Sequence, residues 1–392
     1  MRNILIYRND LLPLSETFIR AQATALRRYQ PHFIGLHSTT PSLLEPGAAL
    51  LAADYDRLPK PLADLAYDYL GASPLLHTRA FMQQLRALQP VLIHAHFATD
   101  AVAALPLAAA LNIPLIVTLH GYDVTVRPGG RNPLRRWVKR QGMKHLANRA
   151  ALFLCVSEFI REQAIAAGYP AAKLLVHHIG IDAETFHPAS TATPSNTVLF
   201  VGRLTEKKGC EYLIRAMAVT QQRYPAAQLI IIGDGPLRSS LQHLAATLGV
   251  QANFAGALHH AAVRNHISAA RVFVLPSVTA NNGDSEGLGM VQLEAQCMGV
   301  PVVATYHGGI PEGIVDGPSG LLSDERDVPA LAHNILRLLQ DDALHTDLSR
   351  RGIQLVQQHF NLSQQTAQLE FLYDAVLAGI PPNTCFSARA TL

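Results

Sequence analysis

Short runs of apolar residues alternate with helix-length segments along this chain of 392 residues. The runs are apolar on both faces, which is typical of parallel strands that helices cover on both sides. Because the alternation occurs in two successive series, it predicts an α/β protein with two doubly wound, Rossmann-like domains. The expected strands are residues 3–7, 32–36, 91–95, 114–119, 152–156 and 173–178 in the first series, and residues 198–202, 228–233, 271–276 and 301–305 in the second.

A polar stretch without periodicity, HPASTATPSN at residues 187–196, separates the two series and predicts a linker. We therefore expect an N-terminal domain over residues 1–188 and a C-terminal domain over residues 197–362. Open parallel sheets bind ligands at the carboxyl ends of their strands, so two facing sheets would put the working site in the cleft between the domains.

Residues 101–119 carry no charge and are long enough to cross a membrane. Pro106, Asn112 and Pro114 interrupt this stretch, and its second half, PLIVTL, is typical of a strand. Of the two interpretations, a membrane span or a buried helix followed by a buried strand, these breakers favour the second.

Composition and charge narrow the function classes. Hydrophobic residues make up 49% of the chain and charged residues 16%, which predicts a large buried core. The net charge of +3 is too weak to indicate a nucleic-acid binder, but residues 1–188 hold 19 Lys and Arg against 13 Asp and Glu. This excess predicts a basic face on one domain. The four cysteines are scattered without a zinc-binding spacing, which fits a reducing cytosol and a cytoplasmic protein.

Two cations follow the first strand of the second series, in the segment VLFVGRLTEKKG. Arg203 and Lys208 lie in a loop that Gly202 and Gly209 bracket. Cations in a glycine-bracketed turn at the carboxyl end of a strand suit an oligophosphate ligand. The alternative is an ordinary solvated surface loop, and this segment alone does not decide between the two.

The next strand ends in IIGDGP, where Gly233 and Gly235 resemble the start of a dinucleotide fingerprint. The third glycine is missing and Pro236 intrudes. A tight turn into a helix is therefore favoured, and a Rossmann dehydrogenase is disfavoured.

The segment EGLGMVQLE follows the strand at 271–276 and a polar loop. Its glycines let the backbone approach a ligand closely, and the amides at the start of the following helix favour phosphate. Glu286 and Glu294 are eight residues apart, about 12 Å along a helix, which is the reach from a sugar to a ribose across a pyrophosphate. The alternative is a helix-capping Glu286 with Glu294 on an exposed face, but the nearby cations favour a ligand site.

These segments resemble glycosyltransferase family 4, the retaining enzymes of the GT-B fold marked by an E-x7-E motif, here Glu286 to Glu294. The resemblance covers nearly the whole chain. SETFI and TANNGDSEG are most similar to the bacterial exopolysaccharide branch, the colanic acid and amylovoran type enzymes. The other matching segments are HAHFATD (94–100), TLHGYDVT (118–125), VSEFIRE (156–162), GIDAETFHP (180–188), GRLTEKKG (202–209), IIGDGP (231–236) and HGGIPEGIVDGPSGLL (307–322).

The resemblance implies roles for the matching residues. Arg203 and Lys208 would bind the donor's diphosphate, and Glu294 the ribose hydroxyls. Glu286 would hold the transferred sugar, which His120 in HGYD would face from the first domain. Further donor contacts are expected from Gly202, from the amides around Gly287, Leu288, Gly289 and Met290, and, at the base, from the backbone of Gly256, Ala257 and Leu258.

The implied reaction is the transfer of a hexose from a GDP- or UDP-sugar to a lipid-linked oligosaccharide in exopolysaccharide biosynthesis. Negative charge grows on the leaving phosphates, and the two cations and the helix start are expected to stabilise it, so we predict metal-independent chemistry without a cofactor. A DYD sequence at residues 54–56 is interpreted as a surface turn and not as a metal site. Same-face attack and a covalent intermediate both stay open as routes to retention. The family also implies that a C-terminal helix, within residues 363–380, crosses back onto the first domain.

The first domain is expected to hold the acceptor. Residues 127–149 contain eight basic residues and no acidic one, with Trp137, the chain's only tryptophan, among them. A basic helix with an interfacial aromatic fits docking on anionic lipid at the inner membrane surface, and a lipid-linked acceptor would explain it. The alternative is a solvated helix face. Glu16 in SETFI is a candidate acceptor-side residue.

Two rival functions remain on this fold: a GT-B nucleotide-sugar epimerase and a non-catalytic scaffold that binds glycan or a partner protein. The intact set of Arg203, Lys208, Glu286 and Glu294 argues against the scaffold. Neither the donor's base nor its sugar is readable, because base recognition in this fold depends on backbone groups.

Overall fold

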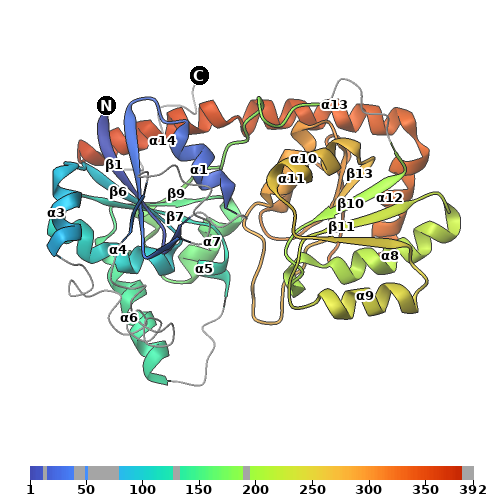
Figure 1. The fold of residues 1–392 in the computed structure, drawn as a ribbon, viewed down its shortest axis with the longest axis horizontal. Helices are drawn as coiled ribbons and strands as arrows, with labels where there is room; N and C mark the ends of the chain where they lie inside the picture. Colours follow the sequence, from blue (N-terminus) through green and yellow to red (C-terminus); the bar gives the residue numbers. More distant parts are fainter. Residues whose placement is uncertain (12–15, 39–48, 52–78, 127–132, 189–194, 382–392) are drawn as a thin grey trace. The chain divides into compact units, whose positions relative to one another are not determined.

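The computed structural model describes residues 1–11, 16–38, 49–51, 79–126, 133–188 and 195–381. The chain divides into two compact units: unit 1 comprises Met1–Gly180 with Leu362–Leu392, and unit 2 comprises Ile181–Asn361. Each unit is built around one parallel sheet with helices packed on it (Figure 1). The expected α/β fold with two doubly wound domains is confirmed.

Unit 1 contains a seven-stranded parallel sheet in the order β5-β3-β1-β6-β7-β8-β9, and β2 pairs with β4 separately. The strands are β1 (Arg2–Tyr7), β2 (Asp10–Leu11), β3 (Tyr29–Gly35), β4 (His37–Ser38), β5 (Ala49–Leu51), β6 (Leu92–His96), β7 (Leu115–Leu119), β8 (Leu152–Cys155) and β9 (Leu174–Val176). The helices that lie between them are α1 (Thr17–Thr24), α3 (Arg79–Ala87), α4 (Ala98–Leu111), α5 (Tyr122–Thr125), α6 (Pro133–Arg149) and α7 (Glu158–Ala166).

The uncharged stretch at 101–119 forms most of α4 and all of β7, both largely buried. Asn112 ends α4 in the left-handed conformation with φ of 54°, which a short polar side chain tolerates and which redirects the chain into the strand. A buried helix followed by a buried strand is therefore confirmed. No helix in the described ranges is long and apolar enough to span a bilayer.

The last helix, α14 (Leu362–Leu377), belongs to unit 1. Leu369, Leu372 and Tyr373 join the same apolar cluster as residues of β1, α1 and β3. The buried Glu370 carboxylate accepts the backbone N–H groups of Arg27 and Arg28 at 2.7 and 2.6 Å. This helix, implied by the family resemblance, thus packs into the core of the unit that begins the chain.

Unit 2 contains a six-stranded parallel sheet in the order β12-β11-β10-β13-β14-β15. Helices α8, α9 and α12 lie against one face, and α10 and α11 against the other (Figure 1). The strands are β10 (Thr197–Val201), β11 (Gln228–Ile232), β12 (Ala252–Gly256), β13 (Val272–Leu275), β14 (Val302–Thr305) and β15 (Leu321–Ser323). The helices are α8 (Cys210–Arg223), α9 (Arg238–Thr247), α10 (His260–Ala269), α11 (Met290–Cys297), α12 (Val328–Gln340) and α13 (Asp342–His359).

The boundary between the units lies at Gly180, whereas the sequence analysis extended the first domain to residue 188. Residues 181–188 belong to unit 2 because two apolar side chains anchor them there: Ile181 and Phe186 are buried, and the Ile181 N–H donates to the Phe360 carbonyl at 2.6 Å. Of the expected linker, residues 189–194 lie outside the described residues.

Strand order fixes where each sheet presents its loops. In unit 2, β10 pairs with β11 on one side and β13 on the other, so the direction of strand succession reverses between β10 and β13. In unit 1 the same reversal occurs between β1 and its neighbour β6. At such a switch point, the loops that leave adjacent strands diverge to opposite faces and open a binding crevice.

Candidate active site

The loop after β10 carries the two cations predicted to bind phosphate. A 3₁₀ turn, Glu206–Lys208, leads into Gly209, whose φ is +62°. A Cβ at Gly209 would lie 1.8 Å from the carbonyl oxygen of Pro276, so only glycine fits. The loop after β10 is therefore in direct contact with the segment that follows β13, at the switch point of the sheet.

Lys208 and Glu286 meet across this contact. Lys208 Nζ donates to Glu286 Oε2 at 2.5 Å, and the two side chains are 15% and 14% exposed. Burial alone would raise the pKa of Glu286, but the charges of Lys208 and Lys207 outweigh it and lower the pKa to about 2. Glu286 is thus a shielded, ionised carboxylate. A second pair, Lys207 with Asp284 at 3.0 Å, lies alongside.

Helix α11 begins just after Glu286. Gly289 precedes it with φ of +76°, and the structure describes no side-chain cap at this helix start. The first amides of a helix have no intrahelical acceptor, and the helix dipole makes this end positive. Leu288 is buried beneath the turn, and Met290 is half-buried. The start of α11 can therefore offer N–H groups to an anion beside the cations of the β10 loop.

Only part of the Glu286–Glu294 spacing is helical, because α11 starts at Met290. The estimate of 12 Å, which assumed a continuous helix, does not apply: residues 287–289 form a turn. Glu294 lies within α11, 14% exposed, with its Oε1 at 3.8 Å from His260 Nε2. The two glutamates therefore lie in different environments, one paired with a lysine and the other beside a histidine at the start of α10.

The expected base-binding backbone begins at Gly256, the last residue of β12. Gly256 has φ of +75°, and its carbonyl accepts the Gly233 N–H at 2.8 Å, which ties the turn after β11 to this segment. Ala257 is exposed and Leu258 is half-buried. Both belong to the loop that leads into α10 and His260.

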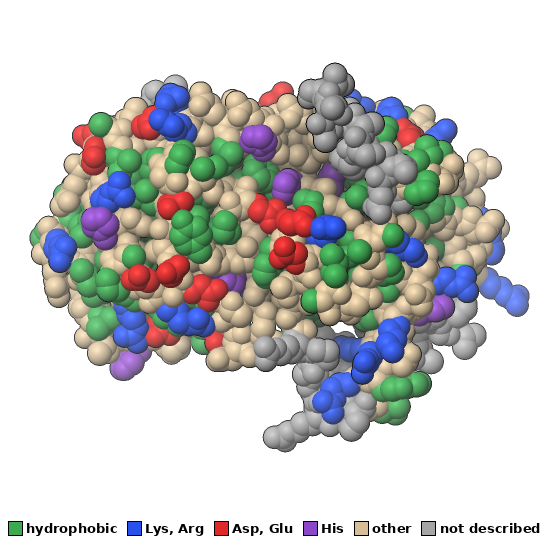
Figure 2. Space-filling model, turned by 180° about the vertical axis from the view of Figure 1, so that it is seen from behind, with side chains coloured by type: hydrophobic (Ala, Val, Ile, Leu, Met, Phe, Trp, Pro, Cys, Tyr) green, Lys and Arg blue, Asp and Glu red, His purple; other side chains and the backbone are tan. Residues whose placement is uncertain are grey.

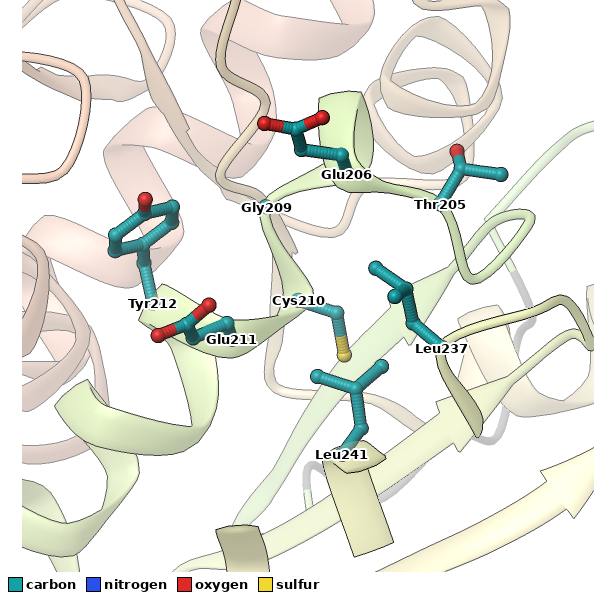
Figure 3. A pocket seen from close by; sticks show the side chains of 8 residues that line it. All are labelled: Thr205, Glu206, Gly209, Cys210, Glu211, Tyr212, Leu237 and Leu241. Carbon is teal, nitrogen blue, oxygen red and sulfur yellow. The ribbon is translucent and has the colours of Figure 1, made fainter. Parts of the chain in front are cut away.

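Arg203 is exposed, directly after the half-buried Gly202. Within the described residues, its guanidinium makes no hydrogen bond or ion pair. A separate cavity of about 90 Å³ lies beside the same loop, lined by residues 205–206, 209–212, Leu237 and Leu241 (Figure 3). Because ligand pockets usually measure about 300–1,000 Å³, this cavity is too small for a nucleotide sugar.

His120 lies in unit 1, at the end of β7. Its Nε2 is 3.1 Å from His96 Nδ1, and its ring centroid is 4.4 Å from that of Phe97. Burial, together with the charge of Arg8, lowers the pKa of His120 well below the ordinary 6.5, so the imidazole is neutral at pH 7. The Asp123 carboxylate accepts the backbone N–H of His120 at 3.1 Å and fixes the turn that carries it.

Glu16 has a defined partner in unit 1. Arg8, at the end of β1, donates to both carboxylate oxygens of Glu16 at 2.8 Å and also to Asp100 at the start of α4. The Arg8 guanidinium lies 4.4 Å from the centroid of the Phe97 ring. Arg8 and Asp100 were not predicted from the sequence, although Arg8 follows β1 at the switch point of its sheet just as Arg203 follows β10 at the switch point of the second sheet.

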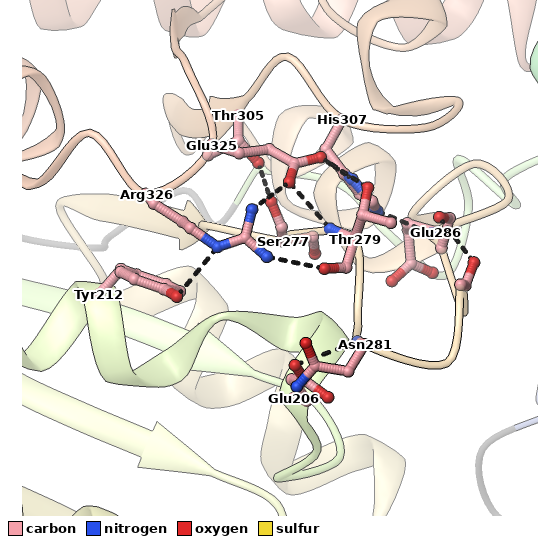
Figure 4. Close-up of polar contacts among 12 residues, drawn as sticks. Glu206, Tyr212, Ser277, Thr279, Asn281, Glu286, Thr305, His307, Glu325 and Arg326 are labelled. Atoms are coloured by element: carbon pink, nitrogen blue, oxygen red, sulfur yellow. Dashed lines mark hydrogen bonds and ion pairs between the residues drawn. The ribbon is translucent and has the colours of Figure 1, made fainter.

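A polar network, also missed, surrounds the loop that contains Glu286. The His307 ring accepts the backbone N–H of Glu286 at 3.0 Å and contacts Glu325 at 2.6 Å (Figure 4). His307 lies in the motif HGGIPE at residues 307–312, which the family resemblance included, whereas no pattern in the sequence indicated Glu325.

Within unit 2 the structure thus brings Lys208 and Glu286 together beside the start of α11, and places Glu294 further along the same helix. His120 and Glu16 lie in unit 1. The DYD sequence at residues 54–56 lies outside the described residues. The described residues include no group of three or more His, Cys, Asp or Glu side chains arranged to hold a metal ion.

Helix α6 carries the described part of the basic segment. It extends away from the sheet of unit 1, and Lys and Arg side chains lie along it (Figures 1 and 2). Leu134 and Trp137 are 56% and 58% exposed. Residues 127–132 lie outside the described residues, and the exposed basic side chains on the helix are Arg136, Lys139, Arg140, Lys144 and Arg149.

Comparison with known proteins identifies the family of this chain. Two family models match adjacent regions: Glycosyltransferase Family 4 over residues 15–185, and Glycosyl transferases group 1 over residues 182–355. The putative colanic acid biosynthesis glycosyltransferase WcaL of Escherichia coli is 30% identical over 292 residues, which cover 72% of this chain and 70% of that protein. The amylovoran biosynthesis glycosyltransferase AmsK of Erwinia amylovora is 34% identical over 243 residues. That match covers 60% of each chain, less than two thirds of the relative's length.

Among solved structures, Anabaena Alr3699/HepE in complex with UDP-glucose has the same fold, with a TM-score of 0.75 at 20% identity. The superposition covers 96% of this chain and all of that one. The chain therefore belongs to glycosyltransferase family 4, with a GT-B fold and with similarity to its exopolysaccharide biosynthesis members.

Proposed function

We propose that this chain is a retaining glycosyltransferase that moves a hexose from a GDP- or UDP-sugar to a lipid-linked oligosaccharide in exopolysaccharide biosynthesis. The observation that carries the proposal is the half-buried Lys208–Glu286 pair at the switch point of the second sheet, beside the start of α11, where no side-chain cap is described. An ionised carboxylate held by a lysine at an anion-binding helix start suits a ligand that joins hydroxyl groups to a diphosphate.

The diphosphate leaves with growing negative charge as the bond to the anomeric carbon breaks. Arg203, which has no partner among the described residues, and Lys208 would stabilise that charge together with the first amides of α11. Because these groups already supply positive charge, we expect transfer without a metal ion or cofactor. A chelator such as EDTA should leave the rate unchanged, and a loss of activity restored by Mg²⁺ would contradict this part of the proposal.

The carboxylates have separate roles in this scheme. Glu286 would accept hydrogen bonds from hydroxyls of the transferred sugar, and its pKa of about 2 keeps it ionised at any physiological pH. Glu294 would hold the ribose hydroxyls, with the backbone at residues 256–258 next to the base. His120, a neutral imidazole, would contribute a hydrogen bond to the sugar from unit 1, with Glu16 near the acceptor. Glu294 is assigned to the ribose, so a glycosidase-like pair of carboxylates is not invoked.

The test is a donor panel that follows released nucleoside diphosphate. UDP-glucose and GDP-mannose are supplied with membrane-extracted lipid-linked oligosaccharide as acceptor. One donor should support release that depends on the acceptor, and Glu286→Ala should abolish it in a chain that stays folded at 25 °C. Glu211→Ala, an exposed glutamate paired with Arg215 on α8, is the matched control and should behave as wild type. Near wild-type turnover in Glu286→Ala would contradict the assignment of Glu286 to the transferred sugar. Epimerised donor without transfer would favour the rival epimerase.

We further propose that α6 docks on anionic lipid at the inner membrane surface. Exposed Leu134 and Trp137 lie on a helix whose exposed charges are all basic, which combines apolar contact with electrostatic attraction. Trp137 is the chain's only tryptophan, so its fluorescence reports on this helix alone. Vesicles of phosphatidylglycerol should shift its emission to the blue, while phosphatidylcholine vesicles or 0.5 M salt should not. Lys139→Glu combined with Arg140→Glu should remove the shift, and an unchanged spectrum in wild type would refute the proposal.

A further inference from the structure

The loop at residues 279–289, between β13 and α11, is held on two sides. On one side it contacts the β10 loop: Asn281 N–H donates to Glu206 at 3.1 Å, and Lys207 pairs with Asp284. On the other side, residues that follow β14 and β15 bind both ends of the loop (Figure 4). The second set includes none of the residues assigned to the donor.

His307 binds the end of the loop that carries Glu286. The backbone N–H of Glu286 can only donate, so His307 Nε2, at 3.0 Å, must be the acceptor and carries no proton. The proton therefore sits on Nδ1, which donates to Glu325 Oε1 at 2.6 Å. With the His307 side chain only 1% exposed, water offers no substitute partner for either nitrogen. The Glu286 carbonyl is also held, because it accepts the Gly309 N–H at 3.1 Å.

Glu325 binds the other end of the loop at the same time. Its carboxylate accepts the backbone N–H of Thr279 at 2.9 Å, the Thr279 hydroxyl at 3.0 Å and the His307 proton. Burial would raise the pKa of Glu325, but these hydrogen bonds lower it overall, so the group remains ionised. The Glu325 carboxylate thus holds Thr279 directly and holds Glu286, seven residues further along the loop, through His307.

Arg326 completes the contact in a costly backbone conformation. Its φ is +67°, which non-glycine residues rarely adopt. In this position the guanidinium donates to the Thr279 carbonyl at 2.8 Å, to Glu325 at 3.0 Å and to the Tyr212 hydroxyl at 3.2 Å. A side chain held in such a conformation is typical of functional sites, where the surrounding contacts maintain the strain.

We propose that His307, Glu325 and Arg326 form a clamp of positioning residues. The clamp holds the 279–289 loop so that Glu286 and the turn before α11 meet the donor sugar without rearranging. This inference deepens the proposed function and rests on the assignment of Glu286 to the transferred sugar. Preorganised groups stabilise developing charge without reorganisation, and a misplacement of about 1 Å can lower a rate about 100-fold. The clamp does not touch Arg203 or Glu294, so donor affinity should depend on it much less than turnover.

The variants separate positioning from stability. His307→Leu removes both hydrogen bonds. His307→Gln can restore them, since one carboxamide accepts and donates. Glu325→Gln replaces one carboxylate oxygen, which accepts hydrogen bonds, by an NH₂ group, which can only donate. This group would face a donor of either Thr279 or His307. The matched control is His345→Leu, which deletes a partly buried histidine contact of unit 2 away from the loop, from His345 Nε2 to the Arg271 carbonyl at 3.0 Å.

With UDP-glucose or GDP-mannose as donor, we expect His307→Leu and Glu325→Gln to lower kcat at least about tenfold, with donor KM within about threefold of wild type. His307→Gln should recover most of kcat, and His345→Leu should lower the melting temperature but not kcat. Equal kcat in His307→Leu and His345→Leu at matched melting temperature would overturn the clamp. The clamp would also be overturned if kcat of His307→Gln did not exceed kcat of His307→Leu.

A second readout does not need transfer. In hydrogen–deuterium exchange, amides of residues 279–289 should exchange at least about tenfold faster in His307→Leu than in wild type, while those of β11 stay unchanged. Unchanged exchange in the loop would refute the clamp whatever the activity. If wild type transfers no sugar yet the loop exchange rises, the proposed function fails while the physical clamp stands. If wild type is active, Glu286→Ala is inactive and His307→Leu is unaffected, the clamp fails alone.

Discussion

Replacing Glu286 by glutamine tests the physical basis of the site directly. Glutamine keeps the size of the side chain and resembles the protonated carboxyl, but it cannot form the charge pair with Lys208. The difference between wild type and Glu286→Gln therefore reports how much the folded chain prefers the ionised form over the neutral form. The substitution leaves the half-buried Lys208 ammonium beside a neutral amide.

The magnitude follows from the pKa of Glu286. The folded state lowers it from 4.5 to about 2, a difference of about 2.5 units. At about 1.4 kcal/mol per unit, ionisation at neutral pH stabilises the folded chain by about 3 kcal/mol. For a unit of this size, we expect the melting transition of unit 2 to fall by roughly 6–12 °C in Glu286→Gln.

The pH dependence has a definite sign. The folded pKa is depressed, so this stabilisation is complete above pH 4.5 and is lost as the pH falls toward about 2. The gap between wild type and Glu286→Gln should be full at pH 7 and about half as large near pH 3. Thermal unfolding followed by circular dichroism between these pH values measures the gap.

A matched exposed pair supplies the control. Glu211 and Arg215 lie one turn apart on α8, both nearly half exposed, so Glu211→Gln should change the free energy of unfolding by less than about 0.5 kcal/mol at every pH. A gap for Glu286→Gln that does not depend on pH would refute the electrostatic reasoning. So would a variant as stable as wild type, because it would mean that desolvation cancels the attraction to Lys208.

Three further predictions follow from the geometry. Gly209→Ala should lower the free energy of unfolding by at least about 2 kcal/mol, because its φ is +62° and a Cβ would strike the Pro276 carbonyl; a calorimetric scan measures this, and an unchanged transition would contradict it. Arg8→Leu should cost about 3–5 kcal/mol in urea unfolding at pH 7, since it leaves the buried Asp100 carboxylate and the half-buried Glu16 carboxylate without their cation; an unchanged unfolding transition would argue against this. The buried thiols of Cys210 and Cys297, with pKa raised by burial to about 12 and about 11, should resist iodoacetamide at pH 8 until the chain unfolds, and a modified native peptide would disprove it.

Much of the fold could be predicted because parallel strands covered on both faces require continuous apolar runs. All ten expected strands exist, with ends displaced by at most a few residues. The missed strands lack that signal. Strand β12, ANFAG, lies at a sheet edge with every residue at least partly exposed, and β15 has only three residues. The boundary at Gly180 was misplaced because buried Ile181 and Phe186 decide it, and the apolar character of two isolated residues does not reveal which sheet they pack against.

The residues of the candidate site also fall into two groups, those that the sequence could predict and those that it could not. Arg203, Lys208 and Glu286 could be predicted as candidates from the sequence because their loops follow apolar strands and contain glycines. The clamp was not found, because His307, Glu325 and Thr279 lie up to 46 residues apart and meet only after β13, β14 and β15 pair. No local pattern distinguishes Glu325 from a solvated glutamate before a helix. Hydrogen bonds between distant loops are set by strand order and register, which a single sequence does not encode as a motif.

The two units share an arginine at corresponding positions, but the surroundings of the two arginines differ in charge. Each unit has an arginine in the loop that follows a strand at the switch point of its sheet, where a doubly wound fold binds ligands. In unit 1, Arg8 is 15% exposed and its charge is more than neutralised by Glu16 and Asp100. In unit 2, Arg203 is exposed and has no partner among the described residues. A diphosphate would meet excess negative charge beside Arg8, but beside Arg203 it would meet a cation that pairs with no described carboxylate. The same topology therefore favours a phosphate-bearing donor in unit 2 and an uncharged part of a substrate in unit 1, a difference that depends on two carboxylates.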